Sequence, residues 1–510
     1  MADITNASSA APVPFYKRPR YKWAIVAMLW WMCFFNYADR QAVSAVLPLL
    51  EKEMHLTAVQ LGMVGAAFAL VYGVFAPFAG NVGDIFRRKS VILWGLWVWS
   101  LICALTAQAR NLPQLLVFRA AEGLGETFYF PATTSLISDY HGKRTRSRAL
   151  GLHNTGVYMG TIGGSVFAGL ISAHYGWRSS FMVFGILGIL LGLALMWFIV
   201  EPKRGAAERA ELTGISSDRN QVESPAPRQS LLRVAGAMLA YVACLSATTY
   251  AGYRIGQWTG FDLRAANIPV APFLGALPGI AGGVMLSMYI SQGKRGLEFL
   301  RWLFSTPTAL VLMLVFMGAN FVALVSLWWM PKFLYDKYHY NLAVAGLVAT
   351  IFINTATMIG APVGGALADI LRRRTPGGRM IVQAAALILA APFVFLTGAT
   401  KAVGVLMVAL SLWGLLKGMY DANIFASAFD VIPPHMRGTA AGFMNMAGWL
   451  GAFPAPIMIG YISEQRNLSF AIASASVVYV GAAVLMILGV LLFAKRDAAR
   501  MEQTLLASAE

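Results

Sequence analysis

Three ionisable residues share one apolar stretch of the sequence, residues 113–138. They are Arg119, Glu122 and Glu126, separated by three and then by four positions. On a helix these spacings place all three side chains on one face, where Arg119 can reach Glu122 and Glu126 lies one turn further. An ionisable group within hydrocarbon costs at least about 3 kcal/mol, so such groups mark either a transport pathway or a charged partner.

A second group of polar residues lies in the apolar stretch 23–46, at Asn36, Tyr37, Asp39 and Arg40. A carboxyl group in a medium of low dielectric holds a proton more readily than in water, and a nearby cation opposes this. A guanidinium group can bind a carboxylate through two parallel hydrogen bonds. A proton and an anion that compete for the same cluster would be coupled in their binding.

These properties predict two sets of functional residues. The predicted proton-coupling residues are Asp39, Glu126 and Glu122, and Glu126 has no local partner in the sequence. The predicted substrate-binding residues are Arg40, Arg119, Tyr37, Asn36, Tyr72, Lys417, Asp421 and Asn423. The alternative is that the charged pairs within single helices only fix helix packing. Those pairs are Arg119 with Glu122 and Lys417 with Asp421.

The composition indicates a membrane protein that crosses the bilayer many times. Hydrophobic residues make up 58% of the 510 and charged residues 12%, a balance that a soluble domain could not hide from water. Stretches of about 20 apolar residues are long enough to cross a bilayer as helices. We expect such helices near 23–46, 60–83, 90–108, 113–138, 150–173, 179–200, 308–331, 343–368, 378–398, 402–427, 438–461 and 468–494.

An internal repeat divides these helices into six and six. Residues 76–89, APFAGNVGDIFRRK, return 285 positions later at 361–374 as APVGGALADILRRR, with seven identities. A second echo lies 291 positions apart, and it relates Asp139, Arg146, Gly151 and Asn154 to Asp430, Arg437, Gly442 and Asn445. Internal repeats of this kind are typical of duplicated transport proteins. The sequence therefore predicts an all-α membrane protein of two six-helix bundles.

Each copy of the first repeat ends an apolar stretch with a carboxylate and then three bases. We predict that these residues form charge contacts between neighbouring helices that break and re-form as the halves move. The predicted gate residues are Gly80, Asp84, Arg88, Lys89, Asp369, Arg373, Arg374, Arg146 and Arg437. The alternative is that the bases are plain topology anchors, which explains less well the Pro, Gly and Asp before them.

A polar linker separates the halves, and two apolar segments follow it. These segments, 234–252 and 267–291, are interpreted as an inserted helix pair. The alternative is a hairpin that lies on the membrane or packs against the bundle. The chain therefore divides into six segments: the N-terminal tail 1–22, the first bundle 23–200, the linker 201–233, the inserted pair with a basic loop 234–306, the second bundle 307–494 and the C-terminal tail 495–510.

The net charge of +17 is a feature of topology rather than of nucleic-acid binding. Most Lys and Arg residues fall in the loops on the side of the termini, which places both termini in the cytoplasm and the protein in the inner (plasma) membrane. No signal peptide is apparent. The three Cys lie in apolar segments, and the six His lack ligand-like spacing, so we expect no disulfide framework, metal, cofactor or enzyme activity.

The motifs resemble those of the major facilitator superfamily along nearly the whole chain. Gly80-x-x-x-Asp84 followed by Arg88-Lys89 is similar to its signature loop, although Ile85 stands where a base is usual and Arg87 where Gly is usual. The first half resembles the Spinster-type lipid transporters in its motifs at 36–40, 76–84, 123–126 and 146–148. The anion:cation symporter branch shares the Asp-Arg pair of the first helix and the sequence at 437–442. Both resemblances imply Asp39 and Glu126 as protonation sites and Arg40 or Arg119 as the anion contact.

We therefore expect a secondary active transporter, coupled to protons, that moves a small organic anion by alternating access. Its partners would be the anion, protons and the lipid bilayer, and one chain would function as a monomer because it contains both halves. One alternative is an exporter of an amphipathic or lysolipid-like compound. An alternative of another class is a membrane sensor without transport, but the longest polar stretch is a linker of about thirty residues, short for an output domain.

Overall fold

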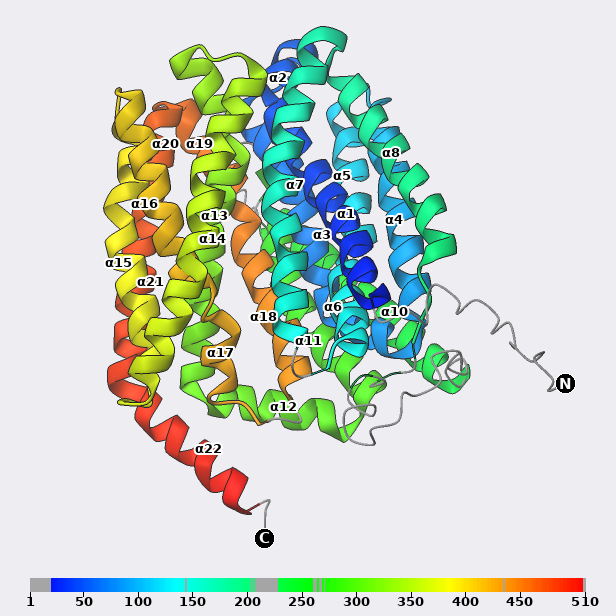
Figure 1. The fold of residues 1–510 in the computed structure, drawn as a ribbon, viewed down its shortest axis with the longest axis vertical. Helices are drawn as coiled ribbons and strands as arrows, with labels where there is room; N and C mark the ends of the chain where they lie inside the picture. The colour runs from blue at the N-terminus through cyan, green and yellow to red at the C-terminus, as the bar shows by residue number, and fades with distance from the viewer. Residues whose placement is uncertain are drawn as a thin grey trace, which may run out of the picture.

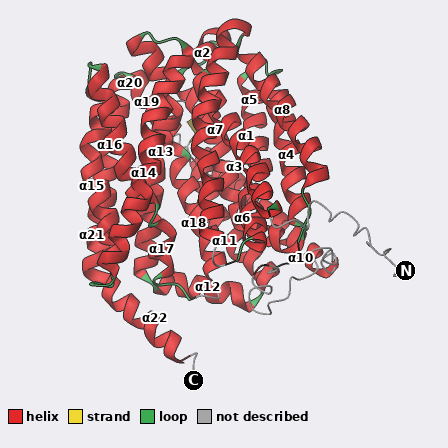
Figure 2. Ribbon diagram, viewed as in Figure 1, coloured by secondary structure: helices red, strands yellow, loops and turns green. Residues whose placement is uncertain are grey.

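The computed structural model describes residues 20–142, 145–202, 204, 207, 228–259, 264–265, 268–269, 271–433 and 436–507. Nearly all of these residues are helical, as Figure 2 shows. The described strands are β1 (Arg264–Ala265) and β2 (Ile268–Pro269), which pair antiparallel. The long helices run along one axis (Figure 1). We call the end that carries α2 (Leu47–Met54) the α2 end, and the end that carries α22 (Lys495–Ala507) the termini end.

The first half contains six helical segments, and two of them are broken. Beside α2 its helices are α1 (Tyr21–Ala45), α3 (Ala58–Ile85), α4 (Arg88–Thr106), α5 (Leu112–Thr127), α6 (Tyr129–Tyr140), α7 (Arg146–Tyr175) and α8 (Trp177–Phe198). In the two broken segments, α1 is followed directly by α2, and α5 by α6. Thr57 and Gln60 form a capping box at the start of α3, and the side chain of Asn111 caps α5. These caps satisfy amide groups that have no partner within the helix, so they fix where α3 and α5 begin.

The second half repeats this arrangement. Its helices are α13 (Pro307–Tyr338), α14 (Leu342–Arg372), α15 (Gly378–Ala399), α16 (Val403–Asp421), α17 (Ile424–Phe429), α18 (Arg437–Ala452), α19 (Pro454–Gln465), α20 (Leu468–Ser474), α21 (Ser476–Gly489), the π-helical turn η3 (Val490–Ala494) and α22. Pro454 separates α18 from α19, as expected of a residue that cannot donate to the preceding turn. Asn341 and Asn467 cap α14 and α20 through their side chains.

The two halves meet along α7 with α14 and along α3 with α18 and α19. Small residues permit this close approach. A Cβ atom added to Gly62 of α3 would lie 2.3 Å from the carbonyl oxygen of Pro456, and one added to Gly346 of α14 would lie 2.8 Å from the carbonyl oxygen of Ser165. Side chains larger than hydrogen therefore cannot be placed at either position without moving a helix.

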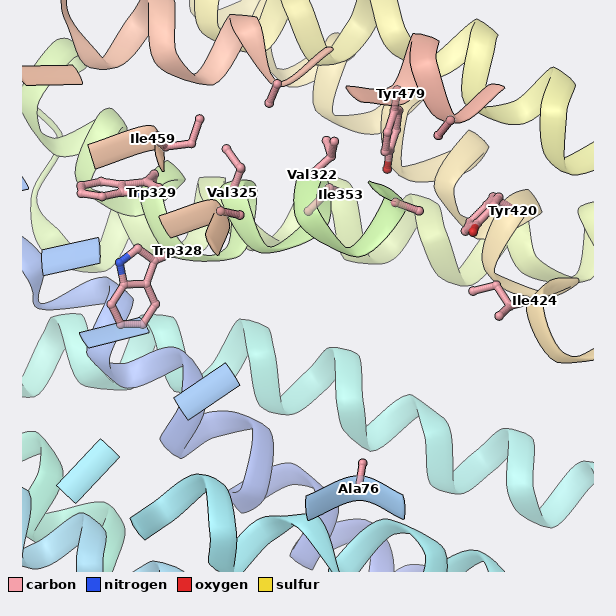
Figure 3. Packing of buried hydrophobic residues seen from close by; sticks show 14 of the residues in the cluster. Ala76, Val322, Val325, Trp328, Trp329, Ile353, Tyr420, Ile424, Ile459 and Tyr479 are labelled. Carbon is pink, nitrogen blue, oxygen red and sulfur yellow. The ribbon is translucent and has the colours of Figure 1, made fainter. Parts of the chain in front are cut away.

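Among the described helices, α13 carries the largest number of buried apolar side chains. Figure 3 shows Val322, Val325, Trp328 and Trp329 on this helix, with Ala76 set apart among helices of the first half. Trp329 is fully buried, and its indole donates to the carbonyl oxygen of Pro456 at 3.1 Å. The predicted fold class is confirmed, and every predicted apolar stretch of the two bundles coincides with a helix or a broken helix.

Some predicted boundaries moved. The stretch predicted at 308–331 continues as α13 to Tyr338, past Lys332 and Asp336, because helix hydrogen bonding does not stop where apolar residues end. In the described part of the chain, eleven helices are long and apolar enough to cross a membrane. Neither α1 nor the broken pair α5 and α6 is among them, and these helices carry the buried charges of the first half.

The insertion consists of α10 (Arg228–Thr259), α11 (Ala271–Gln292) and α12 (Lys294–Ser305). Its helix α10 is long and apolar enough to cross a membrane, whereas the apolar part of α11 is shorter, Pro278–Ser291. Tyr241 of α10 is fully buried, with ring centroids 5.3 Å from Phe78 and 6.4 Å from Phe75 of α3. The helix α12 lies across the termini end (Figure 1). Most of the linker predicted at 201–233 lies outside the described residues.

The helix α12 packs against the second half. Phe299 packs on Phe443 of α18 with ring centroids 5.0 Å apart, and the indole of Trp302 donates to the carbonyl oxygen of Val431 at 3.1 Å. The inserted segment therefore contacts the first half through α10 and the second half through α12.

Candidate functional site

Two buried ion pairs form the centre of the first half. Arg119 pairs with Glu122 one turn along α5, as the spacing predicts. The Nε atom of Arg40 on α1 pairs with Glu126 of α5. Glu126 has no partner one turn away on α5, and its partner Arg40 lies 86 positions away on another helix, which spacing within one helix cannot reveal. Both glutamates and Arg119 are almost fully buried.

Asp39 adds a third carboxyl group to this cluster. Its side chain is fully buried, and neither oxygen has a hydrogen-bond partner among the described residues. Cys103 lies beside Asp39, but its thiol is directed at the carbonyl oxygen of Phe181, 3.5 Å away. Asn36 is also fully buried with neither amide atom paired. A buried, unpaired carboxylate is strongly unfavourable, so a carboxyl group in this setting is stable when it holds a proton.

Aromatic rings surround the Arg40 guanidinium. Its Cζ atom lies 4.7 Å from the ring centroid of Tyr37, 5.0 Å from Phe68, 4.9 Å from Tyr72 and 5.6 Å from Trp449. Three of these rings belong to the first half, and Trp449 comes from α18 of the second. We call these four residues the Arg40 cage. Such contacts stabilise a cation over the face of a ring.

The cage joins both ion pairs and both halves. The Cζ atom of Arg119 lies 4.9 Å from the centroid of Phe68, so this ring contacts both guanidinium groups. Trp449 packs on Tyr72 with centroids 4.7 Å apart. Sequence reasoning did not identify Phe68 or Trp449, because an aromatic residue within an apolar helix gives no signal that separates a binding residue from lipid-facing or core residues.

The second half carries one charged pair in α16. Lys417 pairs with Asp421 as the spacing predicts, and their side chains are 22% and 30% exposed. Tyr158 of α7, in the first half, interacts electrostatically with both. Asn423 does not join them: its amide donates to the carbonyl oxygens of Gly364 (3.2 Å) and Met419 (3.0 Å), where it links α14 to α16. These residues lie outside the cluster around Arg40.

The repeated edge motifs form contacts between helices in both halves. Arg88 of α4 pairs with Asp139 of α6 and with Glu201, where Nε lies 3.2 Å from Oε1. In the second half the Nε atom of Arg372 lies 3.2 Å from Oδ2 of Asp430. In the first half this contact joins the start of α4 to the end of α6. In the second half it joins the end of α14 to the residue that follows α17.

Other predicted gate residues have different surroundings. Asp369 pairs with Arg379 of α15 at 2.9 Å, and the same arginine reaches Asp430 at 2.7 Å, a role that the sequence did not suggest. Arg373 and Arg374 are exposed, and Lys89 is half-buried. Gly80 and Asp84 lie in α3, and their side-chain positions fall outside the described set.

The two arginines of the second repeat, Arg146 and Arg437, make similar contacts in their halves. Arg146 at the start of α7 donates from Nε to the carbonyl oxygen of His141 at 3.3 Å. Arg437 at the start of α18 donates to the carbonyl oxygen of Phe429 at 3.1 Å. Each arginine therefore links the start of its helix to the end of the preceding segment, although the two acceptor carbonyls do not lie at equivalent positions.

Polar contacts between the halves gather at the α2 end. Lys332 of α13 lies 2.5 Å from Oε2 of Glu51 on α2, and 2.6 Å from Oδ2 of Asp336. The backbone amide of Val59 donates to Oε1 of Glu464 at 2.9 Å. Sequence reasoning missed this set because Lys332 lies just beyond the end of the stretch predicted at 308–331. In the described part of the chain, no group of three or more His, Cys, Asp or Glu side chains could hold a metal ion.

Comparisons with known proteins agree with this geometry. The sequence model of the Major Facilitator Superfamily matches residues 29–331 and 326–508. The chain is 23% identical over 475 residues to the hexuronate transporter of Bacillus subtilis, covering 91% of this chain and 94% of that protein. It is 25% identical over 473 residues to a probable sulfoacetate transporter of Cupriavidus necator, covering 90% and 92%.

A solved structure gives the same fold. The crystal structure of a bacterial homologue of the human lysosomal transporter Spinster, inward-facing and unoccupied, superposes with a TM-score of 0.65 at 17% identity. The match covers 94% of this chain and 98% of that chain. At this identity the likeness concerns the fold alone.

Proposed function

The chain belongs to the major facilitator superfamily, and from this premise we propose that it is a proton-coupled carrier that moves a small organic anion by alternating access. The family makes the protein a membrane transporter rather than an enzyme. The cargoes named for the two relatives described above, a hexuronate and sulfoacetate, are both organic anions. The likeness to the Spinster homologue adds no support for a lipid cargo, because it concerns only the fold.

The observation that carries proton coupling is the charge balance of the first-half cluster. It holds three carboxyl groups, those of Asp39, Glu122 and Glu126, against the two guanidinium groups of Arg40 and Arg119. Each guanidinium is paired, so Asp39 is the surplus acid and holds the proton while the cluster is buried. Access of water to Asp39 in another conformation would release that proton.

Anion binding belongs to Arg40. Glu126 occupies the Nε atom of this side chain, whose terminal Nη edge can offer two parallel hydrogen bonds to a carboxylate. An anion at that edge weakens the hold of Arg40 on Glu126, which then accepts a proton more readily. Binding of the anion and of the proton would in this way favour each other.

The unequal closure of the two ends supports alternating access. The Glu51 and Lys332 pair closes the α2 end, and a Cβ atom added at Gly62 would lie 2.3 Å from the carbonyl oxygen of Pro456. Toward the termini end, a Cβ atom added at Gly442 would have its nearest first-half atom, in Pro77, at 3.7 Å. The excess of Lys and Arg on the termini side supports an orientation in the inner (plasma) membrane with that end in the cytoplasm. Both halves belong to one chain, so a monomer suffices.

The test is transport into liposomes that contain the purified protein. With benzoate and D-glucuronate as probes, we expect an imposed pH gradient to drive uptake of at least one of them. Asp39→Asn should lose this gradient-driven uptake and keep counterflow exchange, since the amide cannot exchange a proton. Glu502→Gln, a change at an exposed site on α22, serves as the control. Full gradient-driven uptake by Asp39→Asn would refute proton coupling through the surplus acid.

A further inference from the structure

The faces of the Arg40 guanidinium are covered by rings rather than by polar groups. Tyr37, Phe68, Tyr72 and Trp449 all have centroids within 5.6 Å of its Cζ atom. A guanidinium enclosed in this way can bind an anion only at its edge. The plane of a bound carboxylate then continues the plane of the guanidinium, between the same rings.

The unpaired polar atoms near that edge have no exposed surface. Glu126 and Glu122 each give one oxygen to an arginine, while their second oxygens and the Asn36 amide lack a partner but are closed off from solvent. The Tyr72 hydroxyl is engaged with Arg40 itself. A cargo with many hydroxyl groups would lose its hydrogen bonds to water here without replacement, which is unfavourable for each hydroxyl. A flat apolar body loses nothing of this kind, and it gains contact with ring faces and edges.

Trp449 is the contribution of the second half to the cage. The residue is half-buried, so part of its ring surface remains accessible, and it packs on Tyr72 and on Phe68, with a centroid distance of 5.9 Å for the latter. Its helix is held on both sides: a Cβ atom added at Gly448 would lie 2.6 Å from Phe316 of α13, and one added at Gly73 of α3 would lie 2.9 Å from the Cβ atom of Trp449. The backbone that carries the indole is therefore closely packed at the border between the halves.

We propose that the cargo is a carboxylate with a flat, largely apolar body, such as an aromatic acid, and that Trp449 is the second-half residue that packs against this body. The inference rests on the proposed function and narrows its substrate class. It places cargo selectivity in the cage and charge recognition in Arg40. The carboxylate of a sugar acid can bind the Arg40 guanidinium, but its hydroxyl groups find no partners among the rings of the cage.

The experiment measures binding to the detergent-purified full chain by calorimetry, with benzoate and D-glucarate as probes. Benzoate should bind up to about tenfold more tightly than D-glucarate, the factor expected from one aromatic pair. Trp449→Ala should weaken benzoate binding by about tenfold, while Trp449→Phe, which keeps a ring, should stay within about threefold of the unaltered protein. Trp197→Ala, which removes an exposed indole on α8, is the matched control.

The outcomes separate this inference from the proposed function. Tighter binding of D-glucarate than of benzoate, with both lost in Arg40→Ala, would overturn the aromatic cargo and leave an organic-anion carrier standing. Equal loss of benzoate binding in Trp449→Phe and Trp449→Ala, with thermal unfolding unchanged in both, would overturn the role of Trp449. Binding of neither probe, or binding that Arg40→Ala does not weaken, would overturn the inference and the proposed function together.

Discussion

The two halves share their edges but not their interiors. At the edge, Asp139 pairs with Arg88 and its counterpart Asp430 pairs with Arg372, although the 285-position offset relates Arg372 to Arg87, the neighbour of Arg88. In the interior, the 291-position offset that relates Asp139 to Asp430 carries Arg119 onto Leu410. The same offset carries Glu122 onto Trp413 and Glu126 onto Lys417.

Leu410 and Trp413 are buried parts of an apolar core. The duplicated scaffold has therefore kept the contacts that hold helix ends, while the charge cluster belongs to one half alone. Four predictions test this division.

The largest expected effect is on the buried pair of the first half. Arg40→Met should lower the free energy of unfolding by about 3–5 kcal/mol, because it leaves Glu126 buried without its cation. Thermal unfolding of the purified protein at neutral pH measures this loss. The double variant Arg40→Met with Glu126→Gln should recover part of it. No recovery would mean that the pair is not the source of the effect.

The edge of the first half should matter more than that of the second. Arg88 is buried and contacts two carboxylates and the carbonyl oxygen of Pro202, so Arg88→Ala should cost about 2–3 kcal/mol. Arg372 is 36% exposed, and Arg372→Ala should cost less than about 1 kcal/mol. The same unfolding assay compares them, and equal losses would contradict the difference in burial.

The charged pair of the second half should contribute little to stability. Lys417 and Asp421 are partly exposed, so Lys417→Met should cost about 1 kcal/mol or less. A loss as large as that of Arg40→Met would show that the second half also has a buried charge centre. Transport of the same variant then tells whether the predicted substrate contact of Lys417 exists.

The last prediction concerns pH at the first-half edge. Burial lowers the pKa of the His141 imidazole, whose nitrogens lie 3.1 Å from the carbonyl oxygen of Lys22 and 3.1 Å from Oγ1 of Thr145. The unfolded chain therefore binds the proton first as pH falls, and stability decreases below about pH 6.5, by at most about 1.4 kcal/mol per pH unit. Unfolding between pH 7.5 and 5 should be less pH-dependent in His141→Gln. The same dependence of stability on pH in His141→Gln as in the unaltered protein would contradict the role of His141.

The sequence predicts the fold well because apolar length and internal repetition are local signals. It also predicts pairs one turn apart, such as Arg119 with Glu122. It does not predict the pairing of Arg40 with Glu126 or of Lys332 with Glu51, since both join distant segments and depend on how helices pack. Trp449 was missed for a related reason: its contact with Arg40 exists only once the halves are placed together.

Gly293 is the residue at which the insertion can bend. It lies between α11 and α12 with φ 62°, a conformation that other residues adopt only with strain. On one side of it, Tyr241 fixes the helix pair to the first half; on the other, Phe299 fixes α12 to the second. The distance to which the two bundles can separate at this membrane edge is therefore limited by the length of α12 and by rotation about the backbone dihedral angles of Gly293.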